Sequence, residues 1–208
     1  MLSFCALITK KKFWSLYSVI ISIVLKLYGI KVGKNFYVEG TPRLKINGKA
    51  ENIIIGNNVS FLGEVDLRNR ENGRIIFSDN VTVEGPSRIV SAREGTIEVG
   101  EGSIICVYAI INGGEDIKIG KKCIIGPRAS INANEHRFTK NIPVREAGFV
   151  HAPIHIEDDC WLATNVVINK GIRLGKGSII GSNAVVTEDT EPYSINVGLP
   201  ARKIGERQ

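Results

Sequence analysis

The fold is decided by the stretch IHIEDDCWLATNVVINKGIRLGKGSIIGSNAVV, residues 154–186. An aliphatic residue returns there at every sixth position without a slip. The positions in phase are Ile156, Leu162, Ile168, Leu174, Ile180 and Val186. A period of six fits neither the 3.6-residue period of a helix nor the two-residue alternation of a half-buried strand. It is the period of a β-solenoid, in which each six-residue side contributes one inward side chain and then turns a corner.

The same spacing continues toward the N-terminus in shorter series. They comprise Ile119, Ile125 and Ile131, then Val99, Ile105, Ile111 and Ile117, and more loosely Ile55, Phe61 and Leu67. The series that ends at Ile117 and the series that begins at Ile119 are offset by two residues. The sequence NGGED at 112–116 lies at this offset and indicates a turn insertion. Small residues often follow the inward positions and supply the backbone freedom that corners need. We predict an all-β solenoid over 33–190, preceded by a helical segment over 1–32 and followed by a C-terminal tail over 191–208.

The N-terminal segment is apolar but short. Three lysines at 10–12 precede an apolar run over 13–25, and no A-x-A cleavage pattern follows. The run is shorter than the roughly 20 apolar residues of a membrane-spanning helix. We expect a helix that covers the open end of the solenoid, lies at a membrane interface with Phe13, Trp14 and Tyr17 at headgroup level, or does both.

Composition and cysteine usage limit the classes of partner. Of the 208 residues 43% are hydrophobic, which is ordinary for a globular protein, and the net charge is +6. This basic excess suits polyphosphate ligands, acidic glycans or an anionic membrane surface, and it is equally typical of a plain solvated surface. Four cysteines, Cys5, Cys106, Cys123 and Cys160, are widely spaced with no zinc-like Cys/His cluster. We expect reduced thiols, no metal, no nucleic-acid partner and a cytoplasmic location, at the inner face of the plasma membrane if the helix contacts lipid.

Three motifs carry a resemblance to a known family. They are IHIEDDCWLA at 154–163, GSNAVVT at 181–187 and GLPARKI at 198–204. With the repeat, they make the chain from about residue 33 to 204 resemble the hexapeptide-repeat acyltransferases, and among these the sugar O-acetyltransferases. The resemblance implies a left-handed parallel β-helix, acetyl-CoA as cosubstrate, a carbohydrate acceptor and a homotrimer with sites between subunits.

The repeat is broken once, by the segment NANEHRFTKNIPVREAGFVHAP at 132–153. Long excursions from a rigid scaffold often carry function. His136 lies in this excursion, and a histidine is suited to take a hydroxyl proton near neutral pH. The resemblance implies that His136 is the general base. Asn134 and Glu135 are close enough in sequence for either to orient the ring, and Asn134 is also a candidate for contact with the acceptor. We do not expect catalysis from His151 or His155, and His155 should face outward.

The resemblance implies further site residues in other coils. Trp161 is expected in the active site, where its indole can donate a hydrogen bond and pack on pantetheine or a sugar ring. The other candidates for acetyl-CoA contact are Thr164, Ser182, Thr187, Arg202 and Lys203. Cys106 stands where relatives carry an acceptor-binding asparagine, about thirty residues before the base, and Tyr108 is close to it. The class of acceptor therefore stays open.

The resemblance implies an acetyl-CoA-dependent O-acetyltransferase for a bacterial surface polysaccharide, either capsule or O-antigen, or for its precursor. Three alternatives remain. One keeps the fold and acetylates an amine on a nucleotide-linked amino sugar. Another is a carbonic-anhydrase-like β-helix, which requires three zinc-binding histidines. The third is a non-catalytic, membrane-associated solenoid scaffold.

Overall fold

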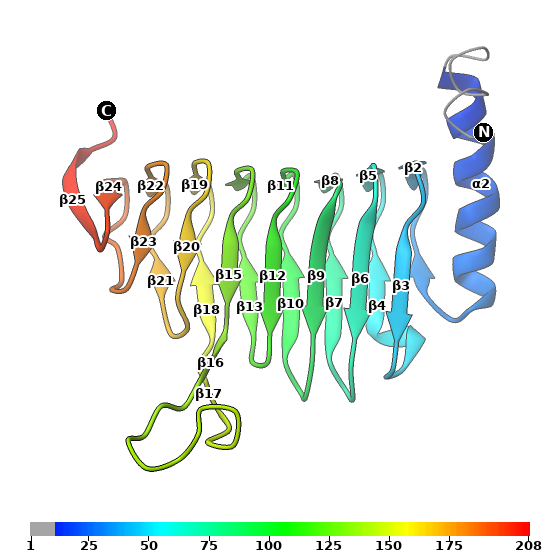
Figure 1. Ribbon diagram of the computed structural model, residues 1–208. Coiled ribbons are helices and arrows are strands. Elements are labelled where there is room, and N and C mark those ends of the chain that lie inside the picture. Colours follow the sequence, from blue (N-terminus) through cyan, green and yellow to red (C-terminus); the bar gives the residue numbers. More distant parts are fainter. Residues whose placement is uncertain (1–10) are drawn as a thin grey trace.

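The structure, a computed structural model, describes residues 11–208 and consists of a parallel β-solenoid with one helix at its N-terminal end (Figure 1). The helix α2 spans Lys11–Leu27, and a single 3₁₀ turn spans Ala50–Asn52. Residues 1–10, which include Cys5 and the first of the three lysines, lie outside the described residues.

Three sheets form the sides of the solenoid, and the chain visits them in turn. The first sheet contains β1 (Lys31–Val32), β4 (Ile53–Ile55), β7 (Arg74–Phe77), β10 (Thr96–Val99), β13 (Ile117–Ile119), β18 (Ile154–Ile156) and β21 (Arg173–Leu174). The second contains β2 (Tyr37–Glu39), β5 (Ser60–Leu62), β8 (Thr82–Glu84), β11 (Ile104–Ile105), β14 (Ile124–Ile125), β19 (Trp161–Leu162), β22 (Ile179–Ile180), β24 (Ser194–Gly198) and β25 (Ala201–Glu206). The third contains β3 (Arg43–Ile46), β6 (Val65–Asn69), β9 (Ser87–Ser91), β12 (Ile110–Gly113), β15 (Ser130–Asn132), β20 (Val167–Ile168) and β23 (Val185–Val186).

The predicted inward positions form the core. Every residue of the four in-phase series is buried, and they belong to one continuous hydrophobic cluster along the solenoid axis. Parallel pairing sets equivalent residues of successive coils directly beside each other, as with Ile156 and Leu174. The six-residue period is therefore confirmed as the spacing between inward residues on consecutive sides.

All departures from the period fall on one edge of the solenoid. Ile156 pairs with Leu174, eighteen residues on, as three sides of six require. Ile97 pairs with Ile117, twenty residues on, whereas Ile53 and Ile75 pair twenty-two residues apart. The extra residues lie in the corners that lead from the third sheet to the first, which we call the insertion edge. The longer turns of the early coils thus explain why the spacing is looser before residue 99.

The corners between the first and second sheets use asparagine in a strained backbone conformation. Asn35, Asn58 and Asn80 all have positive φ, near 54–60°. Asparagine tolerates this left-handed region better than most residues. Their amides also form a ladder, in which Asn35 Nδ2 donates to Asn58 Oδ1 at 3.0 Å and Asn58 Nδ2 donates to Asn80 Oδ1 at 3.1 Å.

Helix α2 covers the N-terminal end of the solenoid. Leu25 is buried in the core cluster, and Tyr17 and Ile21 pack against it. The buried Ser18 hydroxyl accepts a hydrogen bond from the Val38 N–H at 2.8 Å and donates to the Trp14 carbonyl at 2.6 Å. In the part of the chain that the structure describes, no helix combines the length and apolar character needed to cross a bilayer.

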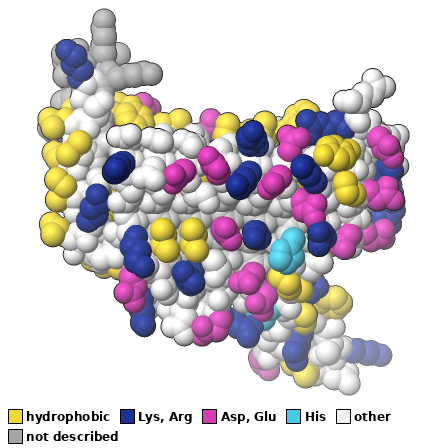
Figure 2. Space-filling view, turned by 180° about the vertical axis from the view of Figure 1, so that it is seen from behind, with side chains coloured by type: hydrophobic (Ala, Val, Ile, Leu, Met, Phe, Trp, Pro, Cys, Tyr) yellow, Lys and Arg dark blue, Asp and Glu magenta, His cyan; other side chains and the backbone are white. Residues whose placement is uncertain are grey.

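The opposite face of α2 is apolar and uncovered. It presents Leu16, Val19, Ile20, Ile23, Val24 and Leu27, each more than half exposed. Figure 2 shows these apolar side chains gathered at one end of the molecule, whereas charges of both signs cover the solenoid face beside them.

At the other end, the predicted tail is structured. Strands β24 and β25 form an antiparallel pair that extends the second sheet beyond β22.

Candidate active site

The predicted excursion begins as a short antiparallel ribbon that projects from the insertion edge (Figure 1). Its strands are β16 (Asn134–His136) and β17 (Phe149–His151). His136 lies opposite Phe149, and Asn134 lies opposite His151. The sequence did not predict this pairing, because three-residue strands are too short to show an alternation of polar and apolar residues.

His136 is exposed on this ribbon. Its ring packs against the Phe149 ring with 4.2 Å between centroids. Within residues 11–208 neither ring nitrogen of His136 has a hydrogen-bond partner. Glu135 does not orient the ring, because its carboxylate accepts a hydrogen bond from Lys170 Nζ at 2.6 Å. The imidazole is therefore held by ring packing alone, and its nitrogens are available to an acceptor.

A cavity of about 400 Å³ lies at the foot of the ribbon. Asn134, Phe149 and His151 of the ribbon line it on one side, and the Gly113-Gly114 turn lies beneath. Earlier coils complete the lining with three arginines, Arg70, Arg88 and Arg93. We call it the ribbon cavity. Asn134, predicted to contact the acceptor, thus lies in the cavity nearest to His136.

His151 is half-buried in the ribbon cavity. Its Nδ1 atom is buried and has no hydrogen-bond partner among the described residues. Burial, and then the positive charge of Arg93, lower the pKa of His151, whereas Glu115 opposes the shift. A Cβ on Gly114 would lie 2.6 Å from this Nδ1 atom, so only glycine leaves room for the imidazole. The turn insertion at 112–116 is therefore also part of a site.

The lowered pKa of His151 predicts a pH dependence of stability. The unfolded chain binds the His151 proton below its ordinary pKa of 6.5, whereas the folded chain keeps the ring neutral to lower pH. The unfolded state then holds more protons, so the free energy of unfolding should fall as pH decreases from about 7 to 5. Urea unfolding at several pH values gives the free energy of unfolding as a function of pH. We expect this free energy to change less steeply with pH for His151→Gln than for wild type. His155→Gln serves as the matched control, and equal slopes for all three proteins would contradict the assignment.

Trp161 lies on a different side of the molecule. It points outward from β19 in the second sheet and is 47% exposed. Ile104, Ile124 and Trp161 occupy the same position on neighbouring strands and form an exposed apolar strip. A small cavity beside Trp161 is lined by Lys122, Ile124, Ile179 and Arg207 among others, and His136 does not line it. One chain alone therefore does not bring His136 and Trp161 together.

Several predicted residues do meet, at the corner between the second and third sheets. Backbone hydrogen bonds stack successive corners there, from Arg128 N to Val107 O at 3.0 Å and from Asn183 N to Thr164 O at 3.0 Å. The residues brought to this edge are Cys106, Tyr108, Thr164 and Ser182. The Arg128 guanidinium lies 5.8 Å from the centroid of the Tyr108 ring. Burial, aided by Glu84, raises the pKa of the Cys106 thiol, so this residue is uncharged.

The basic candidates near the C-terminus are paired with carboxylates. Arg202 lies 3.2 Å from Glu188, and Lys203 forms ion pairs with Glu191 and Glu206. Both line a cavity of about 240 Å³ at the end of the third sheet. Val186 and Glu188, the two sequence neighbours of Thr187, also line it, whereas Thr187 does not. A phosphate that binds here must compete with these carboxylates.

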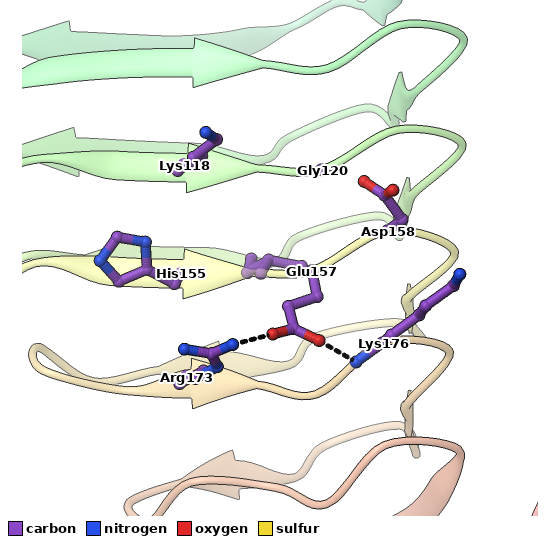
Figure 3. A pocket seen from close by; sticks show the side chains of 8 residues that line it. Lys118, Gly120, His155, Glu157, Asp158, Arg173 and Lys176 are labelled. Atoms are coloured by element: carbon purple, nitrogen blue, oxygen red, sulfur yellow. Dashed lines mark hydrogen bonds and ion pairs between the residues drawn. The ribbon is translucent and has the colours of Figure 1, made fainter.

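A cavity of about 380 Å³ on the first sheet is unrelated to the predicted residues (Figure 3). Lys118, His155 and Arg173 lie on adjacent strands, and His155 faces outward as expected. The Glu157 carboxylate accepts hydrogen bonds from the Arg173 guanidinium and the Lys176 backbone N–H. Because its charged groups largely satisfy one another, we assign it no ligand.

The described residues contain no group of three or more His, Cys, Asp and Glu side chains placed to hold a metal ion. The zinc site with three histidines is therefore not formed within 11–208. Cys106, Cys123 and Cys160 are free thiols.

Known proteins that are similar to this chain include acetyltransferases, and the matching family model describes a hexapeptide repeat. A family model described as bacterial transferase hexapeptide (six repeats) matches residues 153–188. Escherichia coli galactoside O-acetyltransferase is 28% identical over 85% of this chain and 87% of its own length. A probable acetyltransferase of Mycobacterium tuberculosis is 28% identical over 75% of this chain, and the match spans 50% of that protein.

Solved structures agree on the fold. A Vibrio cholerae hexapeptide-repeat acetyltransferase complexed with acetyl-CoA has 33% identity and a TM-score of 0.50, covering 54% of this chain and 61% of that one. An N-acyltransferase from Bacillus cereus, complexed with dTDP-4-amino-4,6-dideoxyglucose and coenzyme A, has 20% identity and a TM-score of 0.62, covering 89% and 88%. The predicted left-handed parallel β-helix with an N-terminal helix is confirmed.

Proposed function

The chain belongs to the hexapeptide-repeat acyltransferases, and on that premise we propose that it transfers an acetyl group from acetyl-CoA to a sugar hydroxyl, with His136 as general base. The observation that carries this proposal is the exposed His136 imidazole beside the polar ribbon cavity. The pairing of acetyl-CoA with a sugar acceptor is supported by the bound acetyl-CoA of the Vibrio cholerae protein and by the galactoside acceptor of the Escherichia coli relative.

The chemistry requires one base. An unbonded imidazole nitrogen of His136 accepts the proton of the acceptor hydroxyl as its oxygen attacks the thioester carbonyl carbon. The new C–O bond forms, the C–S bond breaks, and the imidazolium returns its proton to the departing thiolate of coenzyme A. The ring packing on Phe149 keeps the imidazole above the ribbon cavity, where the acceptor sugar would lie.

The site is completed by a second copy of the chain. His136 and Trp161 lie on different edges of one solenoid, and the apolar strip that includes Trp161 has no partner within the described residues. In the homotrimer that we propose, this strip packs beside the insertion edge of the neighbouring subunit. Burying contiguous apolar surface of this kind is a common basis for oligomerisation.

Acetyl-CoA is proposed to run along the edge between the second and third sheets. Thr164 and Ser182 are exposed on that edge and can hydrogen-bond the pantetheine amides. Thr187 lies farther along, and Arg202 and Lys203 can bind the nucleotide phosphates after releasing their carboxylate partners.

The experiment is transfer from acetyl-CoA with a labelled acetyl group to hydroxy sugars and to matched amino sugars. Label in an alkali-labile ester is the expected result. Label only in a stable amide would favour the N-acetyltransferase alternative, which the amino-sugar ligand of the Bacillus cereus protein suggests. Failure to bind acetyl-CoA in isothermal titration would leave the scaffold function.

We also propose that α2 contacts the inner face of the plasma membrane. Its uncovered apolar face supports this, together with Lys12 and Lys26 at its two ends. The double variant Ile20→Asp/Ile23→Asp should bind vesicles containing anionic lipid at least about 10-fold more weakly, because two half-exposed apolar side chains are lost. Leu199→Asp, which removes an exposed apolar side chain far from the helix, is the control in the co-sedimentation assay. Equal sedimentation of both variants and wild type would refute the contact.

A further inference from the structure

The ribbon cavity contains an unusual concentration of unpaired positive charge. In the described part of the chain, the guanidinium groups of Arg70, Arg88 and Arg93 have no hydrogen-bond or ion-pair partner. Elsewhere on the solenoid arginines commonly carry a carboxylate partner. Arg68 pairs with Asp66 at 2.6 Å, and Arg207 pairs with Asp159 at 2.8 Å. Three arginines without a protein partner therefore surround one hollow, where their guanidinium groups are accessible to an anion.

The coil geometry brings these arginines together from distant positions. Arg88 points outward from β9, beside Ile110 of the next coil. Arg70 and Arg93 lie on the insertion edge, where Arg70 N donates to Ser91 O at 2.9 Å and so stacks one long corner on the next. The positive charge of Arg93 reaches His151 on the far side of the cavity, as the lowered pKa of that histidine reflects.

Acidic groups do not neutralise this cluster. Glu71 is the one carboxylate among the lining residues of the ribbon cavity, and it accepts a hydrogen bond from the Arg93 backbone N–H. Asp66, which lies near Arg88, is already bound by the Arg68 guanidinium. The lining therefore keeps a net positive charge.

The remaining polar groups suit a sugar. Asn112 and Asn134 line the cavity, and the buried Nδ1 atom of His151 has no partner in the described residues. The side-chain amides of Asn112 and Asn134 can exchange hydrogen bonds with a bound hydroxyl, whereas the His151 Nδ1 atom lies against Gly114 and is closed to a ligand. Polar groups of this kind occur beside the arginines and next to the Phe149 ring on which His136 packs.

We propose that the ribbon cavity binds the anionic group of the acceptor, so that the acceptor is a sugar bearing a carboxylate or a phosphate. This inference rests on the proposed function, because it takes the acceptor to lie beside His136. The planar guanidinium binds either anion through two parallel hydrogen bonds. The anion would hold the sugar so that one hydroxyl faces the imidazole of His136.

The test compares glucuronic acid, glucose 6-phosphate and glucose as acceptors. For the anionic acceptors that are acetylated, Arg88→Gln and Arg93→Gln should each raise KM by about 10-fold or more with little change in kcat, because a charged contact used for binding is lost. The KM for glucose should change less than 2-fold. The phosphate and carboxylate arms identify which anion the cavity prefers.

The matched control is Arg43→Gln, since Arg43 is exposed on the third sheet in the same row as Arg88 but does not line the cavity. All three arginines are exposed, so folding should be retained, and circular dichroism checks this. Equal KM changes for neutral and anionic acceptors, or no change at all, would overturn the inference and leave the proposed function intact.

A direct measurement of anion binding distinguishes failure of the proposed function from failure of the proposed anion site. If no acceptor is acetylated, the proposed function fails, and titration of wild type and the Arg88→Gln/Arg93→Gln variant with glucuronic acid and glucose 6-phosphate still tests the cavity. Binding that the double variant loses would support an anion site. Equal binding, or none to wild type, would refute it.

Discussion

Replacing His136 with alanine is expected to lower the rate of acetyl transfer by about 100- to 10,000-fold, the range typical for loss of a general base. The change removes the imidazole that we propose takes the hydroxyl proton, and it leaves the backbone of the ribbon in place. The proposed acetyl-CoA contacts lie on another edge of the solenoid, so acetyl-CoA binding should persist. Single-turnover release of coenzyme A thiol measures the first effect, and isothermal titration measures the second.

The control is His155→Ala, which removes a second exposed histidine. His155 faces outward from the first sheet, away from the ribbon cavity, and its variant should retain full turnover. Wild-type turnover by the His136→Ala variant would contradict the assignment of the base. Loss of both acetyl-CoA binding and turnover would instead indicate that the ribbon supports the cofactor edge of a neighbouring subunit.

Replacing Phe61 with alanine is expected to lower the free energy of unfolding by about 3–5 kcal/mol. Phe61 is fully buried in the core and contacts two other rings edge-to-face, Phe36 at 5.1 Å and Phe77 at 5.4 Å between centroids. The substitution leaves a cavity that stiff parallel coils on either side do not fill, and it also removes both ring contacts.

Urea unfolding followed by circular dichroism measures this loss, with Phe138→Ala as the control. Phe138 lies in the excursion and is 81% exposed, so its variant should stay within about 0.5 kcal/mol of wild type. Each coil contacts chiefly its neighbours, so hydrogen exchange should locate the destabilisation in the N-terminal coils. A change below about 1 kcal/mol for Phe61→Ala would show that these coils repack.

The fold was predictable because the core residues recur at a constant interval of six in the sequence. Ile156, Leu162 and the later in-phase residues mark one inward position for each side, and corners of constant length keep the phase. Where corners lengthen, as between Leu67 and Phe77, the phase is lost although the coil continues. Parallel pairing of long-separated residues sustains the coil there, and a local pattern does not report such pairing.

The candidate site was predictable only in part. His136 was proposed from its place in the excursion and from the family resemblance, and Trp161 was proposed from the motif at 154–163. Arg70 and Arg88 carry no local signal, because coils of unequal length bring them to the excursion. We did not expect a site role for His151, yet the structure places it in the ribbon cavity. The doubled glycine beneath it was the available signal, since close approach of a side chain to the backbone requires glycine at Gly114.

The contact of Ser18 with Val38 has a consequence for solubility. Strand β2 is the outermost strand of its sheet, so its edge would otherwise offer unpaired backbone groups to another molecule. The Ser18 hydroxyl accepts a hydrogen bond from the Val38 N–H, and α2 packs against β1 and β2 at that end. Two uncovered solenoids could stack coil upon coil and grow into filaments, as open parallel edges do in fibrils. The helix therefore blocks stacking of another solenoid at this end and prevents growth into filaments.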